Sequence, residues 1–187
     1  QGGTGGTGTV FKMNTDGSGV AVLKSFDYTA SGAYPQAGLM QGADGALYGT
    51  ATYGGTFGFG TVFKLNTDGT GFTVLQNFDL STTGGYPNLA PLIQGTDGAL
   101  YGTASQGGAS GAGTLFTLNT DGTGFIVIKD FAYSTDGGYP YAGLIQGADG
   151  ALYGTASQNG PSTYGTAFKL NTDGSGFTVL KGFDYST

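Results

Sequence analysis

The chain has 187 residues, of which 40 are Gly, 13 are Phe and 12 are Tyr, and its formal net charge is −6. All 12 acids are Asp, all 6 bases are Lys, and neither His nor Cys occurs. This acidic composition argues against binding to nucleic-acid phosphates or to an anionic membrane surface, and no apolar run approaches the ~20 residues of a membrane span. The absence of Cys excludes disulfides and thiolate metal sites.

The first element along the chain is a β-hairpin that occurs four times. Two β-branched and aromatic runs, residues 9–14 and 20–26, flank the turn sequence Thr15-Asp16-Gly17-Ser18-Gly19. An Asp-Gly pair between such runs indicates a hairpin, because Gly adopts a positive φ without a steric penalty. The central Phe of the four copies stands at positions 11, 63, 116 and 168, at steps of 52, 53 and 52 residues. A period of this length predicts a tandem-repeat fold.

A polar connector follows each of the first three hairpins and ends in Tyr-Pro, at positions 34–35, 86–87 and 139–140. Pro favours an extended residue before it and has no N–H to donate to a central ladder. We therefore expect each Tyr to be extended and each Tyr-Pro pair to lie just before a strand.

A second hairpin follows Tyr-Pro, with strands at 38–41 and 46–51 around the turn Gly42-Ala43-Asp44-Gly45. The block recurs at 92–104 and 144–156. A Gly stands inside each return strand, where we expect it to allow close backbone contact between sheets. These residues are Gly49, Gly102 and Gly154.

Two hairpins in each period predict an all-β fold of tandem ~52-residue repeats, each a four-stranded antiparallel propeller-like blade. The alternative is a fibre of β-repeats stacked along a line. The chain opens in mid-repeat and holds 3.5 repeats. The expected divisions are a half repeat at 1–33 and repeats at 34–85, 86–138 and 139–187. Unpaired strand edges at the open half invite association with more chain or another copy.

The motifs Asp-Gly-Ala-Leu-Tyr-Gly-Thr and Gly-Thr-Val-Phe-Lys-Leu-Asn-Thr-Asp-Gly, in fixed order, resemble the GloVer tandem repeat of bacterial proteins. The resemblance covers essentially the whole chain. It implies a secreted or surface-attached repeat protein, often carrying a separate anchor, and therefore an extracellular or cell-surface location. It brings no catalytic residues.

The Asn-Thr-Asp-Gly turns are weak candidates for Ca²⁺ binding, since Asn and Asp oxygens two residues apart suit a hard cation. The EF-hand pattern needs further carboxylates and a Glu, which this chain lacks. The simpler interpretation is that these side chains bond their own turn, so we expect no metal and no other cofactor. The eight candidates are Asn14, Asp16, Asn66, Asp68, Asn119, Asp121, Asn171 and Asp173.

The Tyr residues before Pro are candidates for stacking on sugars, because a Tyr ring offers an apolar face and a polar edge. These residues are Tyr34, Tyr86 and Tyr139. The alternative interpretation is that the Tyr side chains fill the spaces between neighbouring sheets, as Tyr48, Tyr101 and Tyr153 within strands would do.

We predict no catalytic site and no enzymatic activity. Nucleophilic triads lack His and Cys, and the turn Asp residues recur once per repeat, whereas a glycosidase pair should be singular. Of the Asp residues outside the hairpin turns, Asp130 and Asp136 would be the candidates for a glycan-cleaving enzyme.

The sequence thus favours a structural or adhesive extracellular repeat protein that self-associates through its unpaired terminal strands into a scaffold or filament. The alternative function is a closed β-propeller that binds carbohydrate or protein through its loops. Glycans are possible partners, and we expect neither nucleic-acid binding nor membrane insertion.

Overall fold

The computed structural model describes residues 2–162 and 164–185, and this part of the chain forms strands and no helix. The strands make one two-stranded sheet and three four-stranded antiparallel sheets, each with its strands in sequence order. The predicted all-β fold of four-stranded, propeller-like blades is confirmed. The division into repeats at 34, 86 and 139 stays a prediction, and residues 1 and 187, which bound the outer units, lie outside the described part.

The half-blade contains β1 (Thr9–Lys12) and β2 (Ala21–Ser25). Blade 1 contains β3 (Met40–Gln41), β4 (Leu47–Ala51), β5 (Thr61–Leu65) and β6 (Thr73–Asn77). Blade 2 contains β7 (Ile93–Gln94), β8 (Leu100–Ala104), β9 (Thr114–Leu118) and β10 (Ile126–Asp130). Blade 3 contains β11 (Ile145–Gln146), β12 (Leu152–Ala156), β13 (Thr166–Leu170) and β14 (Thr178–Gly182).

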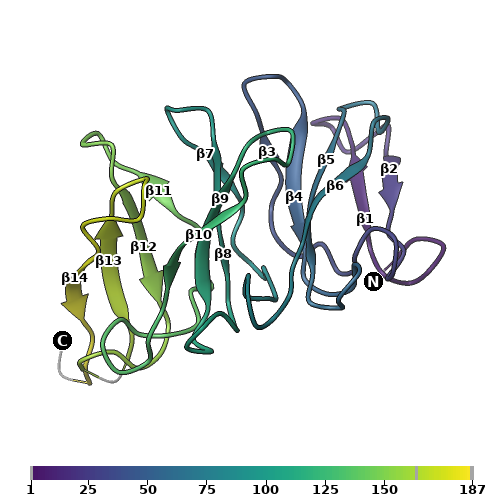
Figure 1. Cartoon of the computed structure of the whole chain (residues 1–187). Coiled ribbons are helices and arrows are strands. Elements are labelled where there is room, and N and C mark those ends of the chain that lie inside the picture. The colour runs from purple at the N-terminus through teal and green to yellow at the C-terminus, as the bar shows by residue number, and fades with distance from the viewer. Residues whose placement is uncertain (1, 163, 186–187) are drawn as a thin grey trace.

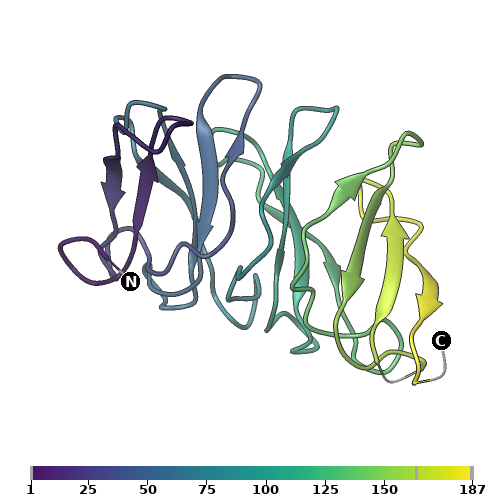
Figure 2. The ribbon, with the colours of Figure 1, turned by 180° about the vertical axis from the view of Figure 1, so that it is seen from behind.

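The blades stand side by side in an arc, with the N-terminal half-blade at one end and blade 3 at the other (Figures 1 and 2). The Asp-Gly hairpins project on the upper side of Figure 1, which we call the hairpin face. The connectors between blades and the Gly-rich loops lie on the opposite side, the connector face. No closed ring forms within the described residues, so the array has two free ends.

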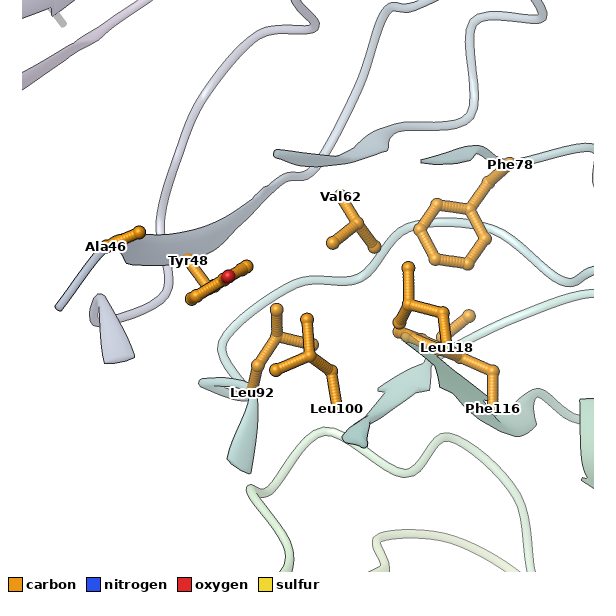
Figure 3. Packing of buried hydrophobic residues seen from close by; sticks show 9 residues of the cluster. Ala46, Tyr48, Val62, Phe78, Leu92, Leu100, Phe116 and Leu118 are labelled. Carbon is orange, nitrogen blue, oxygen red and sulfur yellow. The ribbon is translucent and has the colours of Figure 1, made fainter. Parts of the chain in front are cut away.

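The hydrophobic core lies between blades. Tyr48, Val62 and Phe78 of blade 1 pack against Leu100 and other residues of blade 2 (Figure 3). Successive residues of a strand point to opposite faces of its sheet, so one blade can pack against both of its neighbours. Burying one large apolar side chain stabilises a fold by ~1.5–3 kcal/mol, and these side chains are buried only when the next blade is present.

Corresponding clusters join the half-blade to blade 1 and blade 2 to blade 3. Each junction places the Phe that follows the outer strand of one blade against the central Phe of the next. The ring centroids of Phe26 and Phe63 are 5.1 Å apart, and the Phe78–Phe116 and Phe131–Phe168 pairs are at 5.2 and 5.1 Å. Such pairs contribute ~0.5–1.5 kcal/mol beyond the area that they bury.

The Gly inside each return strand leaves space that a Phe ring of the same blade occupies, and the atoms nearest to it belong to side chains and not to the backbone of a neighbouring sheet. Gly102 is paired with Phe116 across the ladder, and a Cβ on Gly102 would lie 2.6 Å from both Phe116 Cζ and Leu92 Cδ2. Gly49 and Gly154 are crowded in the same way by the Phe and Leu of their own blades. The expectation of close backbone contact at these positions is therefore wrong, because the approaching atoms belong to side chains.

The Tyr residues before Pro are not extended. Tyr34, Tyr86 and Tyr139 have φ values of 56°, 57° and 56°, in the left-handed region that costs a non-Gly residue about 1–2 kcal/mol. The surrounding hydrogen bonds explain this conformation. Tyr86 N–H donates to Phe59 O of blade 1 at 2.8 Å, and Tyr86 O accepts from Ser105 N–H of blade 2 at 3.2 Å. The strained residue thus joins two consecutive blades by its backbone.

Adding one methyl group at Gly102 should destabilise the array. We expect Gly102→Ala to lower the free energy of unfolding by ~1–3 kcal/mol, because Phe116 and Leu92 must shift to admit the Cβ. Gly38→Ala is the matched control, since a Cβ on Gly38 meets no atom within 4 Å. Urea denaturation of the two variants tests this, and equal stabilities would contradict the packing role of Gly102.

Candidate functional site

The Asn-Thr-Asp-Gly turns lie on the hairpin face, and their side chains bond within the turn. In all four turns the Asn Nδ2 donates to a Ser or Thr hydroxyl at 3.0 Å, and the Asp Oδ1 accepts from the backbone N–H of that Ser or Thr at 2.9 Å. The hydroxyl and this N–H lower the pKa of Asp16, Asp68, Asp121 and Asp173. The turn itself thus uses the carboxylate oxygen of each Asp and the amide nitrogen of its Asn partner, at Asn14, Asn66, Asn119 and Asn171, so these side chains bond within their own turn as the simpler interpretation expects. The absence of a bound metal at these turns stays a prediction.

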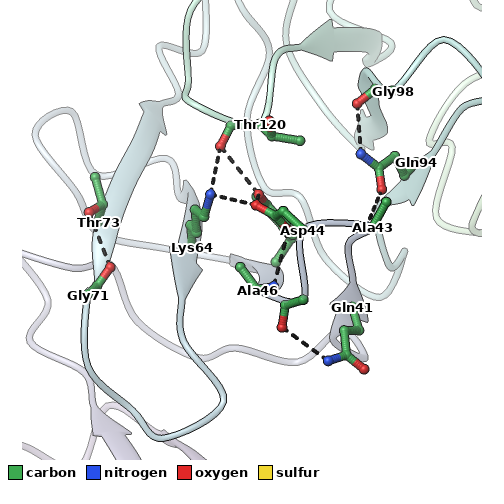
Figure 4. A network of polar contacts seen from close by, with 12 residues as sticks. Gln41, Ala43, Asp44, Ala46, Lys64, Gly71, Thr73, Gln94, Gly98 and Thr120 are labelled. Carbon is green, nitrogen blue, oxygen red and sulfur yellow. Dashed lines mark hydrogen bonds and ion pairs between the residues drawn. The ribbon is translucent and has the colours of Figure 1, made fainter.

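The other hairpin turns carry an Asp–Tyr pair. Tyr48 Oη donates to Asp44 Oδ2 at 2.8 Å, and Lys64 Nζ lies 2.8 Å from the same oxygen (Figure 4). The Lys64 and Tyr48 hydrogen bonds lower the pKa of Asp44 to about 2. Lys64 Nζ also reaches Thr120 O of blade 2 at 3.5 Å, so this cluster helps to join two blades.

An amide beside this cluster makes a second link between blades. Gln94 of blade 2 accepts the Ala43 N–H of blade 1 on Oε1 at 2.8 Å and donates its Nε2 to Gly98 O of its own turn at 2.8 Å (Figure 4). Gln146 makes the same bridge between blades 2 and 3, at 2.9 Å to Thr96 N. The hairpin face is therefore occupied by contacts that position the blades.

The two Asp residues named as glycosidase candidates hold loops in place. Asp130 Oδ1 accepts the Ala109 N–H at 2.8 Å, and Asp136 Oδ2 accepts the Ala132 N–H at 3.0 Å. Lys129 Nζ lies 2.6 Å from the Asp136 carboxylate. Across residues 2–162 and 164–185, no group of three or more acidic, His or Cys side chains gathers where it could hold a metal ion.

The connector face carries two rows of aromatic rings that include the three predicted stacking residues. In the first row Tyr53 makes edge contacts with Tyr34 and Tyr86, at centroid distances of 5.8 and 5.3 Å, and Tyr86 contacts Phe59. In the second row Tyr139 lies between Tyr133 and Tyr141, at 5.6 and 5.8 Å. Tyr34, Tyr86 and Tyr139 are half-buried, and each supports other rings. By contrast Tyr48 and Tyr101 are buried in the cores between blades, as the alternative interpretation expects, whereas Tyr153 of the last blade is half-buried.

A hollow of about 320 Å³ opens on this face where the connectors of three blades meet. Its lining residues are Gln36 and Tyr53 of blade 1, Asn88 and Leu89 of blade 2, and Tyr141 of blade 3. The prediction from sequence missed Tyr53 and Tyr141. The available signal was their departure from the repeat, because Tyr53 stands where the later copies have Gln106 and Gln158, and Tyr141 follows Pro where the earlier copies have Gln36 and Asn88.

The two ends of the array expose residues that are buried inside it. Phe11 of the half-blade is 54% exposed, whereas the corresponding Phe63 and Phe116 are fully buried. At the other end Phe183 is 37% exposed, whereas the corresponding Phe78 is fully buried. Other large apolar side chains are exposed beside them: Met13, Val20 and Val22 at the first end, and Ile145 and Leu180 at the second.

A family model described as the Gloeobacter/Verrucomicrobia repeat matches residues 1–187. The chain belongs to this repeat family. The match confirms the resemblance inferred from the Leu-Tyr-Gly-Thr and Val-Phe-Lys-Leu motifs, and it agrees with the periodic blades. A comparison with curated proteins gave no match.

Among solved structures, this member of the Gloeobacter/Verrucomicrobia repeat family is similar to a chain from a nidogen/laminin complex, with a TM-score of 0.62, 18% identity and 95% of this chain covered. It is also similar to a protein of unknown function from Dyadobacter fermentans, with a TM-score of 0.51, 13% identity and 78% of this chain covered. The family member spans 58% and 42% of the lengths of these two chains. At these identities the likeness shows the fold alone.

A gluconolactonase from Xanthomonas campestris matches at a TM-score of 0.44 and 14% identity, over 89% of this chain and 66% of its own, and this match carries no argument about activity. The described residues include no helix that is long and apolar enough to cross a membrane.

Acid should weaken the cluster that Asp44 forms with Tyr48 and Lys64 in blade 1. The pKa of Asp44 is lowered from 3.8 to about 2, so in this range the folded protein binds fewer protons than the unfolded chain. The stabilisation is complete above pH 3.8 and is lost as the pH falls through about 2. We expect the thermal midpoint of Asp44→Asn to fall less steeply between pH 4 and pH 2 than that of the unaltered protein. Equal slopes, measured by circular dichroism, would contradict this role.

Proposed function

We propose that the protein is a non-enzymatic structural or adhesive repeat protein outside the cell, and that copies of it associate end to end. The observation that supports this proposal is the complementarity of the two ends. Each end exposes one half of a contact that occurs three times inside the chain. A second copy of the chain fits both ends.

The Phe pairs support a match between the two ends. Inside the chain, the Phe after the outer strand of one blade meets the central Phe of the next at 5.1–5.2 Å. Phe183 stands where Phe26, Phe78 and Phe131 stand in the earlier units, directly after the outer strand. Phe11 is the central Phe of the half-blade and corresponds to Phe63, Phe116 and Phe168. If the C-terminal blade of one copy faces the half-blade of another, Phe183 and Phe11 repeat the internal contact and leave water together.

The hairpin turns provide a second match. The turn glycines Gly69, Gly122 and Gly174 lie against Leu23, Leu75 and Ile128 of the preceding blade. A Cβ on the corresponding Gly17 of the half-blade would meet no atom within 4 Å, so the surface over Gly17 is not covered by an apolar residue of another blade. Leu180, the corresponding apolar residue of blade 3, is 50% exposed at the other end. A head-to-tail junction places Leu180 of one copy over Gly17 of the next.

This contact is heterologous, because it joins two different surfaces. Such contacts generate a closed ring when the rotation per copy closes, and a filament when it does not. A filament corresponds to the scaffold function. A closed ring corresponds to the second candidate, a β-propeller that binds carbohydrate or protein through its loops, and the curved arrangement of the blades supports it. The non-enzymatic assignment is supported by the Asp carboxylates, since Asp44, Asp130 and Asp136 are engaged in contacts that hold turns and loops.

Placing a charge at either end should abolish association. We expect the unaltered chain to form assemblies whose mass grows with concentration, and Phe11→Asp and Phe183→Asp to stay monomeric, because a carboxylate cannot be buried against an apolar surface without a partner. Phe57→Asp is the matched control, since Phe57 is 53% exposed but lies in a loop of blade 1 away from both ends. Sedimentation velocity at several protein concentrations measures the outcome.

The form of the assemblies decides between the two candidates. Masses that rise without limit support the filament, and one discrete oligomer supports the closed ring. A monomer at all concentrations, or assembly that survives both end variants, would contradict end-to-end association.

A further inference from the structure

We propose that the hollow lined by Gln36, Tyr53, Asn88, Leu89 and Tyr141 binds an uncharged sugar in its pyranose form. The C–H face of the sugar would lie on a Tyr ring, and its hydroxyl groups would bond the two carboxamides. This inference does not depend on end-to-end association, because the lining comes from blades 1, 2 and 3 and includes none of the apolar end residues.

The hollow has the dimensions and position of a ligand site. Its volume of about 320 Å³ lies at the lower end of the range for small-molecule pockets, ~300–1,000 Å³. Connectors that are about 50 residues apart in the sequence converge on it, so its shape is fixed by the packing of three blades and not by one loop.

The two Tyr rings that line the hollow are held in place by other rings. Tyr53 is 41% exposed and makes edge contacts with Tyr34 and Tyr86. Tyr141 stacks on Tyr139 with 12° between the ring planes, and its backbone N–H donates to Tyr139 O at 2.8 Å. Rings that are already fixed lose little conformational entropy on binding a ligand. The aromatic rows thus act as supports for the two rings that face the hollow.

The polar groups suit hydroxyl groups. Asn88 Nδ2 donates to Ser105 Oγ at 2.9 Å, which orients the carboxamide, and Gln36 Oε1 lies 3.4 Å from Thr52 Oγ1. Among the residues that the structure describes, these are the side-chain hydrogen bonds of the two amides, so the Asn88 carbonyl and the Gln36 NH₂ keep capacity for a ligand. A carboxamide both donates and accepts, as a pair of adjacent sugar hydroxyls does. The lining carries no charge, which favours a neutral ligand over a phosphate or a uronate.

The identity of the lining residues supports a site more than a structural role. Residues that the fold needs recur in every copy, as the central Phe and the strand Gly do. Tyr53 and Tyr141 each occur once at their place in the repeat, where the other copies have Gln or Asn. The two rings that face the hollow are therefore not required by the repeat, and together they give the connectors of blades 1 to 3 a surface that depends on residues found once in the repeat.

Titration with neutral tetrasaccharides tests the proposal. We would use cellotetraose, maltotetraose, mannotetraose, galactotetraose and xylotetraose as probes, with tetragalacturonate as the charged comparison. Binding is measured by calorimetry and by Tyr fluorescence, which no Trp obscures because the chain has none. We expect at least one neutral probe to saturate one site per chain and tetragalacturonate not to bind. The weakest binding that we count as support is a Kd of about 1 mM, which corresponds to about −4 kcal/mol. If none of the five neutral probes binds at a concentration about 10-fold above this value, the proposal is overturned.

Variants locate the binding site. We expect Tyr141→Ala to weaken binding by ~10-fold or more, which corresponds to a loss of about 1.4 kcal/mol, because both the ring contact and the apolar area that it buries are removed. Tyr141→Phe keeps the ring and should bind within about 3-fold of the unaltered protein, whereas Gln36→Ala should weaken binding. Tyr28→Ala is the matched control, because Tyr28 is 46% exposed but does not line the hollow. Equal binding by Tyr141→Ala, or an equal loss in Tyr28→Ala, would overturn the assignment, and melting curves confirm that each variant is folded.

Discussion

The packing of one blade against the next is the interaction on which the rest of this structure depends. The clusters of buried apolar residues lie between sheets. In each blade the ring of the central Phe fills the space that a Gly leaves in the paired strand. The Phe after the outer strand of the preceding blade packs against that ring. A repeat of this size cannot bury both faces of its sheet alone, so stability comes from neighbours. The strained Tyr-Pro corners and the Gln bridges then fix how each blade sits on the next.

The two proposals follow from this one-dimensional arrangement. A junction that needs a partner on each side leaves unsatisfied surfaces at both ends, which is why Phe11 and Phe183 are exposed although the corresponding residues are buried. The same junctions bring successive connectors together on one face, which is how Tyr53 and Tyr141 come to line one hollow. Assembly would use the ends of the array and ligand binding its face, so both can operate in one molecule.

The sequence predicted the hairpins and the four-stranded blades because these depend on local signals, namely Asp-Gly turns and runs of β-branched and aromatic residues. It did not predict the left-handed conformation of Tyr86, because hydrogen bonds from two separate blades stabilise that residue against its own preference. It also misjudged Gly102, whose free space is used by a ring from the paired strand. The hollow was missed because Tyr53 and Tyr141 are brought together only by the packing of three blades, which no local pattern records.

Native-state hydrogen exchange of the dilute monomer tests the central claim most directly, namely that each blade is stable only through its neighbours. The account predicts that amides of β8 and β9, which have blades on both sides, exchange most slowly, and that amides of β1, β2 and β14 exchange fastest. Protection should fall in steps toward both ends, because a terminal blade lacks one of its two packing partners. Equal protection of the half-blade and blade 2, or blades that open independently of their neighbours, would contradict the account.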